Sequence, residues 1–425
     1  MKAYILDTQR RIPPFDKSVS KIYSPFINFG NLVREEIALA KVKVRGIKDP
    51  KEIDNSEPVI LLPDYVFVTA SLIKKFIFLC QNTPNKIQRL SVIKSKLTDF
   101  YAPLMDLSEL SVNGERRLLF DIFYIPKGVP YLKDCTSENI IERLRKEAID
   151  TKVSQNFGIR VERAVNVKNR PFFEEFPVTD EIVGHLTFWI HPLLMNILYL
   201  NTYRNRLMAS EYSFGFLNKK EVIDEGNIRG SVVGSNVWLH PTSIIENSVI
   251  ADNTRVGARA IIKNSVIMRD CNIGDCNIIK NSLFGESVTS LSNSRFRSSV
   301  IAPNCTVSNL GFCYSMLGEG SFLTTAVIFL YEGVDSTIKI RCGKEEYDTG
   351  KYFLGSAAGE NSILGTRAIV SPGLSIPSKT LIVLRPEEGV MKIQDLIESE
   401  YYIWDSATLK RFEDVFPHLN KTDFL

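Results

Sequence analysis

A long-period repeat in the C-terminal half of the chain restricts its fold more than any other feature of the sequence. A serine recurs at every seventeenth position, each time followed by an apolar residue, at Ser231, Ser248, Ser265, Ser282, Ser299 and, one position early, Ser315. Within a block the apolar residues are six apart, as at Ile250, Val256 and Ile262. Neither an α-helical period nor a single strand produces this spacing. The repeat therefore predicts a three-sided parallel β-helix from about Val232 to Val383, with one inward apolar residue on each side.

The corners of the predicted coils have their own sequence pattern. Small or polar residues at Asn253, Gly257, Gly274 and Asn277 fit corners that require a positive φ. The recurring serines are expected to form hydrogen bonds along a corner of the stack. A row of nucleophiles is the alternative interpretation, and the regular spacing favours the structural one.

Two segments depart from the repeat. The polar stretch 331–351 interrupts the ladder near Tyr331 and is expected to form an arm or hairpin at one corner. Loops inserted at one corner of a solenoid frequently form its binding face. The repeat ends after Pro386, and the tail 386–425 has a roughly helical pattern of aromatic and acidic residues. We expect this tail to cap or flank the open end of the solenoid.

The N-terminal half of the chain shows mixed α/β signals instead of a repeat. Apolar runs predict strands at Ala3–Leu6, Val59–Leu62 and Leu118–Ile125, and two segments predict helices, Asn139–Ile149 and Ile182–Met208. These elements indicate a sheet covered by helices, whose strand order the sequence does not fix. The predicted parts of the chain are an α/β domain at 1–220, a β-helix at 221–385 that contains the arm 331–351, and a helical tail at 386–425.

The composition narrows the class of protein and its compartment. The 425 residues include 52 basic and 49 acidic side chains, so the net charge of +3 does not indicate a nucleic-acid-binding surface. The N-terminus lacks the apolar core of a signal peptide, and no run of about 18 apolar residues predicts a membrane span. The seven cysteines form no CxxC pair, which argues against a zinc site or a disulfide framework. A reducing cytoplasm is the expected compartment.

Two stretches of sequence carry a resemblance to a known family. The segment Ile338–Leu381 contains a KIRCG strand, a DTG and a PGLSI corner, and HPLLMNILYLNTYRNRL precedes the β-helix. On these residues the chain resembles sugar-phosphate nucleotidyltransferases with a C-terminal left-handed β-helix, the nearest type being the bifunctional N-acetylglucosamine-1-phosphate uridyltransferases and their archaeal and bacterial relatives. The resemblance implies left-handed coils, although general rules for strand crossovers favour the right-handed form. It also implies a homotrimer formed through the β-helix.

The resemblance further implies a nucleotidyltransferase site with Mg²⁺ in the α/β domain. The family has the motif GxGTRLxPLT after its first strand, where this chain reads LDTQRRIPPFDKSVSK. The spacing from Arg10 to Pro13 is kept, but both glycines are missing, so close backbone approach to a triphosphate is not expected. Arg10 is the candidate nucleotide-binding residue. Asp64, which follows the strand ILLP, is the candidate metal ligand, and capping of a turn is its alternative role.

The resemblance implies acyl transfer as a second activity, with acetyl-CoA or another acyl-CoA and a histidine as general base. None of the four histidines lies in the middle or late coils. A zinc site of the carbonic-anhydrase type needs three histidines on the solenoid, so the sequence excludes such a site. His185 and His191 are expected to be satisfied core residues. The candidate residues for binding a sugar phosphate or CoA lie in the arm: Lys339, Arg341, Asp348, Thr349 and Lys351. The alternative interpretation of the arm is a solvated loop.

These predictions combine into one functional hypothesis and one alternative. The chain is expected to be a member of the sugar-phosphate nucleotidyltransferase and hexapeptide acyltransferase superfamily that acts on, or binds, a sugar phosphate or nucleotide sugar. The alternative is a non-catalytic scaffold or regulatory subunit that has kept the fold and lost both sites. The missing glycines and the missing solenoid histidine favour the alternative.

Overall fold

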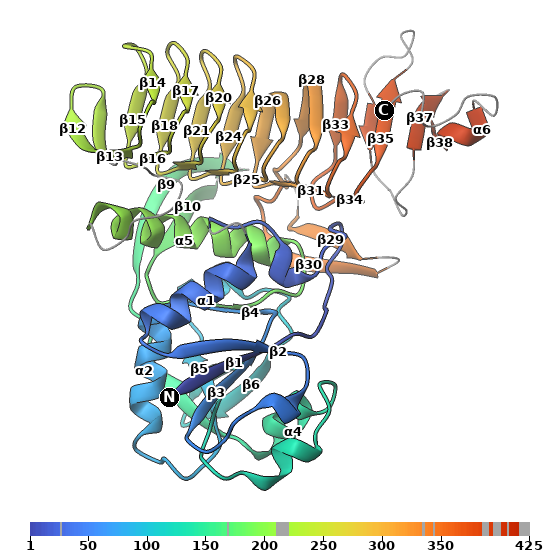
Figure 1. The fold of residues 1–425 in the computed structure, drawn as a ribbon. Helices are drawn as coiled ribbons and strands as arrows, with labels where there is room; N and C mark the ends of the chain where they lie inside the picture. Colours follow the sequence, from blue (N-terminus) through green and yellow to red (C-terminus); the bar gives the residue numbers. More distant parts are fainter. Residues whose placement is uncertain are drawn as a thin grey trace. The chain divides into compact units, whose positions relative to one another are not determined.

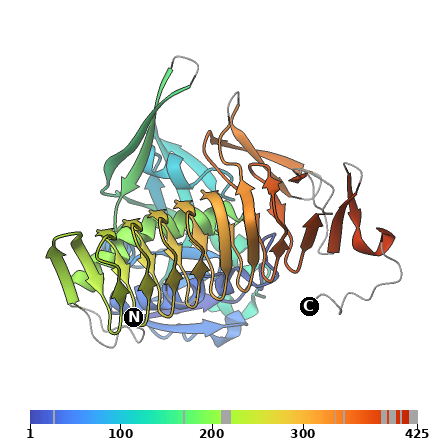
Figure 2. The same ribbon diagram turned by 90° about the horizontal axis from the view of Figure 1, so that it is seen from above.

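The computed structural model describes residues 1–25, 28–167, 170–209, 221–333, 336–342, 345–384, 391–393, 401–405 and 408–415. The chain divides into two compact units (Figures 1 and 2). The first contains Met1–Ile12 and Lys17–Tyr199, and the second contains Pro13–Asp16 and Leu200–Leu425. In the described part of the chain, no helix has the length and apolar character required to span a membrane.

The first unit is a mixed α/β sheet, as expected. The strand order is β2-β1-β3-β7-β5-β8, with β6 paired to β7. Both neighbours of β1 are parallel to it, whereas β7 is antiparallel to β3 and β5. The strands are β1 (Lys2–Leu6), β2 (Lys43–Ile47), β3 (Val59–Pro63), β5 (Gln88–Ile93), β6 (Ser108–Val112), β7 (Glu115–Ile125) and β8 (Ile149–Val153).

Helices and two short antiparallel pairs complete this unit. The helices are α1 (Phe29–Leu39), α2 (Ala70–Cys80), α3 (Lys96–Tyr101), α4 (Ile140–Glu147) and α5 (Ile190–Met208), the last of which continues into the second unit. The pairs are β4 (Val66–Val68) with β11 (Val183–His185) and β9 (Gly158–Val167) with β10 (Arg170–Val178). The helix expected over Ile182–Met208 is therefore wrong for its first residues, because Val183–His185 pair with β4 instead.

The second unit is a parallel β-helix whose coils pair in the expected register. Ile250 pairs with Ile267, and the same wall continues through Phe284, Ile301 and Leu317. These side chains belong to one buried apolar cluster. Stacking of this kind satisfies the backbone between coils and removes each inward side chain from water.

The coils run along the second unit from β13 to β35, and β12 (Glu221–Glu225) pairs antiparallel to β13 (Figure 1). Their strands are β13 (Ile228–Val233), β14 (Trp238–Leu239), β15 (Ile244–Glu246), β16 (Val249–Ile250), β17 (Arg255–Val256), β18 (Ile261–Lys263), β19 (Val266–Ile267), β20 (Asn272–Ile273), β21 (Ile278–Lys280), β22 (Leu283–Phe284), β23 (Thr289–Ser290), β24 (Arg295–Arg297), β25 (Val300–Ile301), β26 (Thr306–Cys313), β27 (Met316–Leu317), β28 (Phe322–Phe329), β31 (Ala357–Ala358), β32 (Ile363–Leu364), β33 (Ala368–Val370), β34 (Ser375–Ile376) and β35 (Leu381–Leu384).

The serines form a ladder of hydrogen bonds at one corner, which confirms the structural interpretation. The Ser248 hydroxyl donates to the Glu246 carbonyl (2.7 Å) and accepts from the backbone N–H of Ser265 (3.2 Å). The same pair of contacts recurs at Ser265, one coil further on. Each hydroxyl thus satisfies one backbone group in its own coil and one in the next, and none is free to act as a nucleophile.

Three of the four predicted corner residues are explained by contacts with the next coil and not by backbone conformation. Asn253 has a φ of 58°, as expected. Gly257 and Gly274 do not have positive φ; a Cβ on Gly257 would lie 2.8 Å from the backbone N of Asp275 in the next coil. Asn277 also lacks a positive φ, and its side-chain oxygen accepts from the Ser294 N–H (2.7 Å). Close approach of the next coil therefore explains the two glycines, and a hydrogen bond to the next coil explains Asn277.

The arm is present, but the tail differs from the expectation. The arm is an antiparallel hairpin of β29 (Ile338–Cys342) and β30 (Glu345–Lys351), which leaves one corner of the stack (Figure 2). The described tail consists mainly of strands and has one short helix, namely β36 (Met391–Ile393), β37 (Tyr401–Asp405), β38 (Thr408–Arg411) and α6 (Phe412–Val415). The helical prediction is wrong for most of these residues, because β37 pairs in parallel with β35 and extends the open edge of the stack.

The aromatic row inside the β-helix provides a test of this packing. The ring centroid of Phe296 lies 4.8 Å from that of Phe284 and 6.4 Å from that of Phe312. Phe296→Ala is expected to lower the free energy of unfolding by about 3–5 kcal/mol, because it leaves a cavity in the stack. Phe322→Ala is the matched control, because Phe322 is 41% exposed. In urea denaturation this control should lower the free energy of unfolding by less than about 1 kcal/mol. Equal losses would contradict the inward ladder.

Candidate functional site

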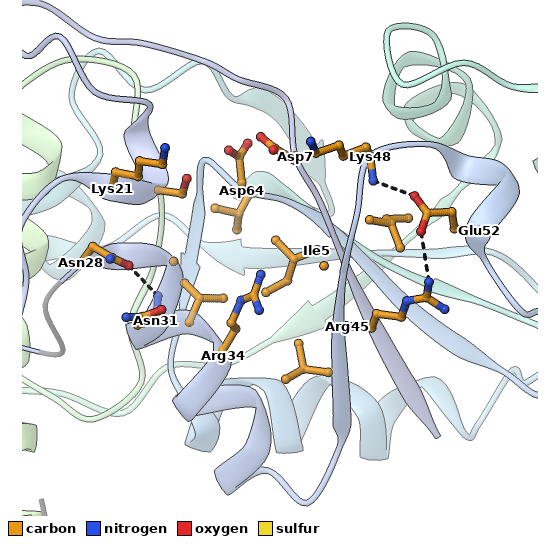
Figure 3. A pocket seen from close by; sticks show the side chains of 17 residues that line it. Ile5, Asp7, Lys21, Asn28, Asn31, Arg34, Arg45, Lys48, Glu52 and Asp64 are labelled. Carbon is orange, nitrogen blue, oxygen red and sulfur yellow. Dashed lines mark hydrogen bonds and ion pairs between the residues drawn. The ribbon is translucent and has the colours of Figure 1, made fainter. Parts of the chain in front are cut away.

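A pocket of about 860 Å³ opens in the first unit where three parallel strands end (Figure 3). The carboxyl ends of parallel strands form the usual ligand-binding edge of such sheets. Asp7 follows β1, Lys48 follows β2 and Asp64 follows β3, and the beginning of α1 forms the opposite wall. The lining residues are Ile5, Asp7, Ser20, Lys21, Asn28, Gly30, Asn31, Val33, Arg34, Val44, Arg45, Gly46, Ile47, Lys48, Glu52, Asp64 and Val66.

Asp64 is the most deeply buried acid of this pocket, with 7% of its surface exposed. Its Oδ1 accepts hydrogen bonds from the Thr8 backbone N–H (3.1 Å) and hydroxyl (2.6 Å). Its Oδ2 is buried without a hydrogen-bond partner. Burial raises the pKa of Asp64 against the effect of the Thr8 donors and of the Ser20 hydroxyl, and the nearby charge of Asp7 adds to the increase. A buried oxygen of this kind is costly unless a cation, a proton or a ligand satisfies it.

Asp7 is a functional candidate that the sequence analysis missed. It follows β1 as Asp64 follows β3, and the two carboxyl groups lie side by side in the pocket (Figure 3). The backbone N–H of Gln9 donates to Asp7 Oδ1 (3.1 Å), which holds this carboxylate in a turn. The signal in the sequence was available, because both aspartates directly follow a short apolar strand.

The pair of carboxylates fits Mg²⁺ better than a metal held by protein ligands alone. No cluster of three or more His, Cys, Asp or Glu side chains suited to a metal occurs among the residues that the structure describes. Mg²⁺ commonly takes only one or two carboxylates and completes its shell with water and substrate phosphates. The unpartnered Oδ2 of Asp64 and the adjacent carboxylate of Asp7 would hold such an ion, whose charge would attract and orient phosphate oxygens.

Four cationic side chains surround the two aspartates. Arg45 is paired with Glu52 (3.1 Å), so it is largely neutralised. Lys21, Arg34 and Lys48 have no side-chain ion pair within the described residues, although all three line the pocket. The sequence did not reveal these residues, because a loop, a helix and an edge strand bring them together.

Arg10 lies outside the lining of this pocket. Its guanidinium carbon is 5.0 Å from the centroid of the Tyr65 ring, which follows Asp64 in the chain. The contact is a cation–π interaction with a ring that is itself buried. The nucleotide-binding role of Arg10 stays a prediction, and the geometry gives it a packing role beside the pocket.

A buried charge network lies beyond Tyr65. The Tyr65 hydroxyl donates to Asp121 Oδ2 (2.8 Å), and Arg89 and Arg145 both donate to the same carboxylate. Burial acts to raise the pKa of Asp121, but the hydrogen bonds of Arg145 and the charge of Arg89 bring it below the usual value. The network fixes the loop after β3 on the sheet, and its buried members point to a structural function.

Both apolar-segment histidines are satisfied core residues, as expected. His185 Nε2 accepts from the Asp121 N–H (2.9 Å), and its Nδ1 lies 3.0 Å from the Asp106 carbonyl. His191 Nδ1 accepts from the N–H groups of Thr187 and Phe188, and its Nε2 lies 2.9 Å from the Pro103 carbonyl. Each ring has one donor and one acceptor role, so both are neutral.

The arm forms a second, smaller pocket of about 550 Å³ in the β-helix unit. Lys339 and Arg341 face the same side, as their alternation predicts, and both line this pocket. Glu346 pairs with both, at 3.5 Å from Lys339 and 2.8 Å from Arg341, and its single negative charge offsets half of their combined charge.

The other arm candidates do not line this pocket. Asp348 accepts from the Thr337 hydroxyl (2.8 Å), and the buried Thr349 hydroxyl donates to the Ile338 carbonyl, so both stabilise the hairpin. The backbone N–H of Lys351 donates to the Thr349 hydroxyl (3.3 Å). A sugar-phosphate or CoA role for the five arm residues stays a prediction.

The fold defines a two-part architecture, a mixed α/β sheet followed by a long parallel β-helix of hexapeptide-type coils. The comparison with known families agrees: residues 218–313 match the family model of the GMPPB C-terminal domain, a left-handed β-helix of sugar-phosphate nucleotidyltransferases. The match covers less than a quarter of the chain and lies within the repeat. No curated protein matches the sequence. This match confirms the resemblance of the β-helix to that of sugar-phosphate nucleotidyltransferases, but it does not specify an activity.

The buried imidazole of His185 generates a pH dependence. Burial lowers its pKa to about 4, whereas an unfolded histidine titrates near 6.5. Between these values only the unfolded chain binds the proton, so the free energy of unfolding should fall by up to about 1.4 kcal/mol per unit as the pH decreases. His185→Gln should remove this part of the slope in urea denaturation from pH 7.5 to 4.5, and His240→Gln should not. Equal slopes for wild type and His185→Gln would contradict this prediction.

Proposed function

We propose that the α/β domain binds a sugar phosphate or nucleotide sugar, together with a divalent cation, in the pocket at the carboxyl ends of β1, β2 and β3. The observation that carries the proposal is the unpartnered, buried Oδ2 of Asp64 beside the carboxylate of Asp7. A bound Mg²⁺ would satisfy this oxygen and would offset the repulsion between the two carboxylates.

The distribution of charge in the pocket supports an anionic ligand. Asp7 and Asp64 face Lys21, Arg34 and Lys48, whereas Glu52 is paired with Arg45. When a divalent cation neutralises the two aspartates, the three remaining cations give the pocket a net positive charge. Phosphate oxygens would then bind to both the metal ion and the basic side chains, with charge-assisted hydrogen bonds from the latter.

The sequence of the loop after β1 favours binding over rapid nucleotidyl transfer. The residues TQRRIPPFDKSVS contain no glycine, so this loop presents no glycine-rich backbone cradle for a triphosphate. A ligand-binding subunit without fast turnover is therefore the form of the proposal that the chain supports best. The scaffold alternative, in which both sites are lost, instead requires that no ligand of this class binds. Acyl transfer, the homotrimer and the cytoplasmic location stay predictions.

The proposal is tested by calorimetric titration with nucleoside diphosphate sugars and sugar 1-phosphates, with Mg²⁺ or with EDTA. Asp64→Asn should weaken Mg²⁺-dependent binding at least about tenfold, because it removes the charge that holds the ion. Its melting temperature should change little, because the asparagine oxygen still accepts from Thr8, and the removal of a buried charge offsets the burial of an unpaired amide N–H at the other position.

The exposed Asp99 of α3 supplies the matched control. Asp99→Asn should leave both the affinity and the requirement for Mg²⁺ unchanged. Absence of binding for the whole ligand series, or binding that neither EDTA nor Asp64→Asn alters, would overturn the proposed function.

A further inference from the structure

Arg34 is an exposed cation that is nevertheless directed into the pocket. It lies in α1, and Figure 3 shows its guanidinium beside Ile5, below Asp64. It has no hydrogen-bond or ion-pair partner within the described part of the chain. The nearby acid Glu52 is engaged by Arg45 and by the backbone N–H groups of Lys48 and Asp49. The five N–H donors of Arg34 are therefore free for a ligand.

Gly46 of β2 makes room for this side chain. A Cβ at Gly46 would lie 2.7 Å from Arg34 Nη2, which is closer than such contacts allow. The φ of Gly46 is not positive, so backbone conformation does not require a glycine here. Because Gly46 has no side chain, the guanidinium of Arg34 can lie against the backbone of the edge strand β2.

We propose that Arg34, lying against Gly46, is the phosphate-binding residue that replaces the absent glycine-rich loop. This inference rests on the proposed function and assigns the anionic part of the ligand to one side chain. A guanidinium offers a planar, bidentate donor pair that matches two oxygens of a phosphate. Asn28, Gly30 and Asn31, at the N-terminal end of α1, line the same wall and add the positive end of the helix dipole.

The inference is tested by titrating the full chain with Mg²⁺-pyrophosphate and with the nucleoside diphosphate sugars. Arg34→Gln should weaken binding of both ligand types by about 10- to 100-fold, as expected for loss of a bidentate charged contact. Arg34→Lys should restore only part of the affinity, because an ammonium group does not form the paired contact. Lys43→Gln is the matched control, because it removes an exposed charge from the same strand outside the pocket.

A double-mutant cycle tests the role of Gly46 separately. Gly46→Ala displaces only the flexible end of Arg34, so it should weaken pyrophosphate binding by about 3- to 10-fold with an unchanged melting temperature. In the Arg34→Gln background the same substitution should have no effect on binding. An equal effect in both backgrounds would overturn the assignment of Gly46 as the residue that seats Arg34.

The remaining outcomes separate the two proposals. If nucleotide sugars bind to wild type and Arg34→Gln with equal affinity, the phosphate-binding role of Arg34 is overturned and the proposed function stands. If wild type binds nucleotide sugars but not pyrophosphate, the role of Arg34 as a general phosphate site is likewise overturned. If wild type binds neither ligand type, both proposals are overturned.

Discussion

In the α/β unit, Leu6 of β1 pairs with Pro63 of β3, so the two residues that follow leave the sheet at the same edge. Those residues are Asp7 and Asp64, and their proximity follows directly from the parallel register of two short strands. Lys48 reaches the same edge because β2 also pairs in parallel with β1, whereas Lys21 and Arg34 reach it from the 3-10 helix Val19–Lys21 and from α1.

Parallel pairing determines the β-helix as well, and there the sequence was sufficient to predict it. The regular period of the serines and apolar residues specifies which side chains face inward, and Ile250 and Ile267 do lie on the same wall. The sequence was less informative about the reason for each corner residue. Gly257 looks like a conformational glycine, but it is selected by the backbone of the next coil, a distance that no local pattern encodes. The tail was mispredicted because its strands depend on the open edge of the last coil.

The pocket was only partly predictable for a similar reason. Asp64 could be found because it directly follows a buried apolar strand, and the same pattern was present at Asp7. Arg34 and Lys21 could not be found, because their positions depend on how α1 and its preceding loop fold against the sheet. The prediction for Arg10 depends on its spacing to Pro13 alone, and the loop between them contains no glycine. Tertiary contacts, which a single sequence does not contain, decide which charges meet.

The arm is an insertion that leaves the stack of coils undisturbed. Ser315 and Ser356 form the same corner hydrogen bond as earlier serines, although 41 residues separate them instead of 16 or 17. Leu317 likewise pairs with Ala358 as if the two coils were consecutive in the chain. The register of the coils is thus kept across the excursion, although the hairpin packs back onto them: Ile340 is fully buried, and a Cβ on Gly373 would lie 1.9 Å from the Lys339 carbonyl oxygen. The exposed side chains of the hairpin can therefore be changed while the coils keep their register, whereas its buried side chains belong to the packing of the scaffold.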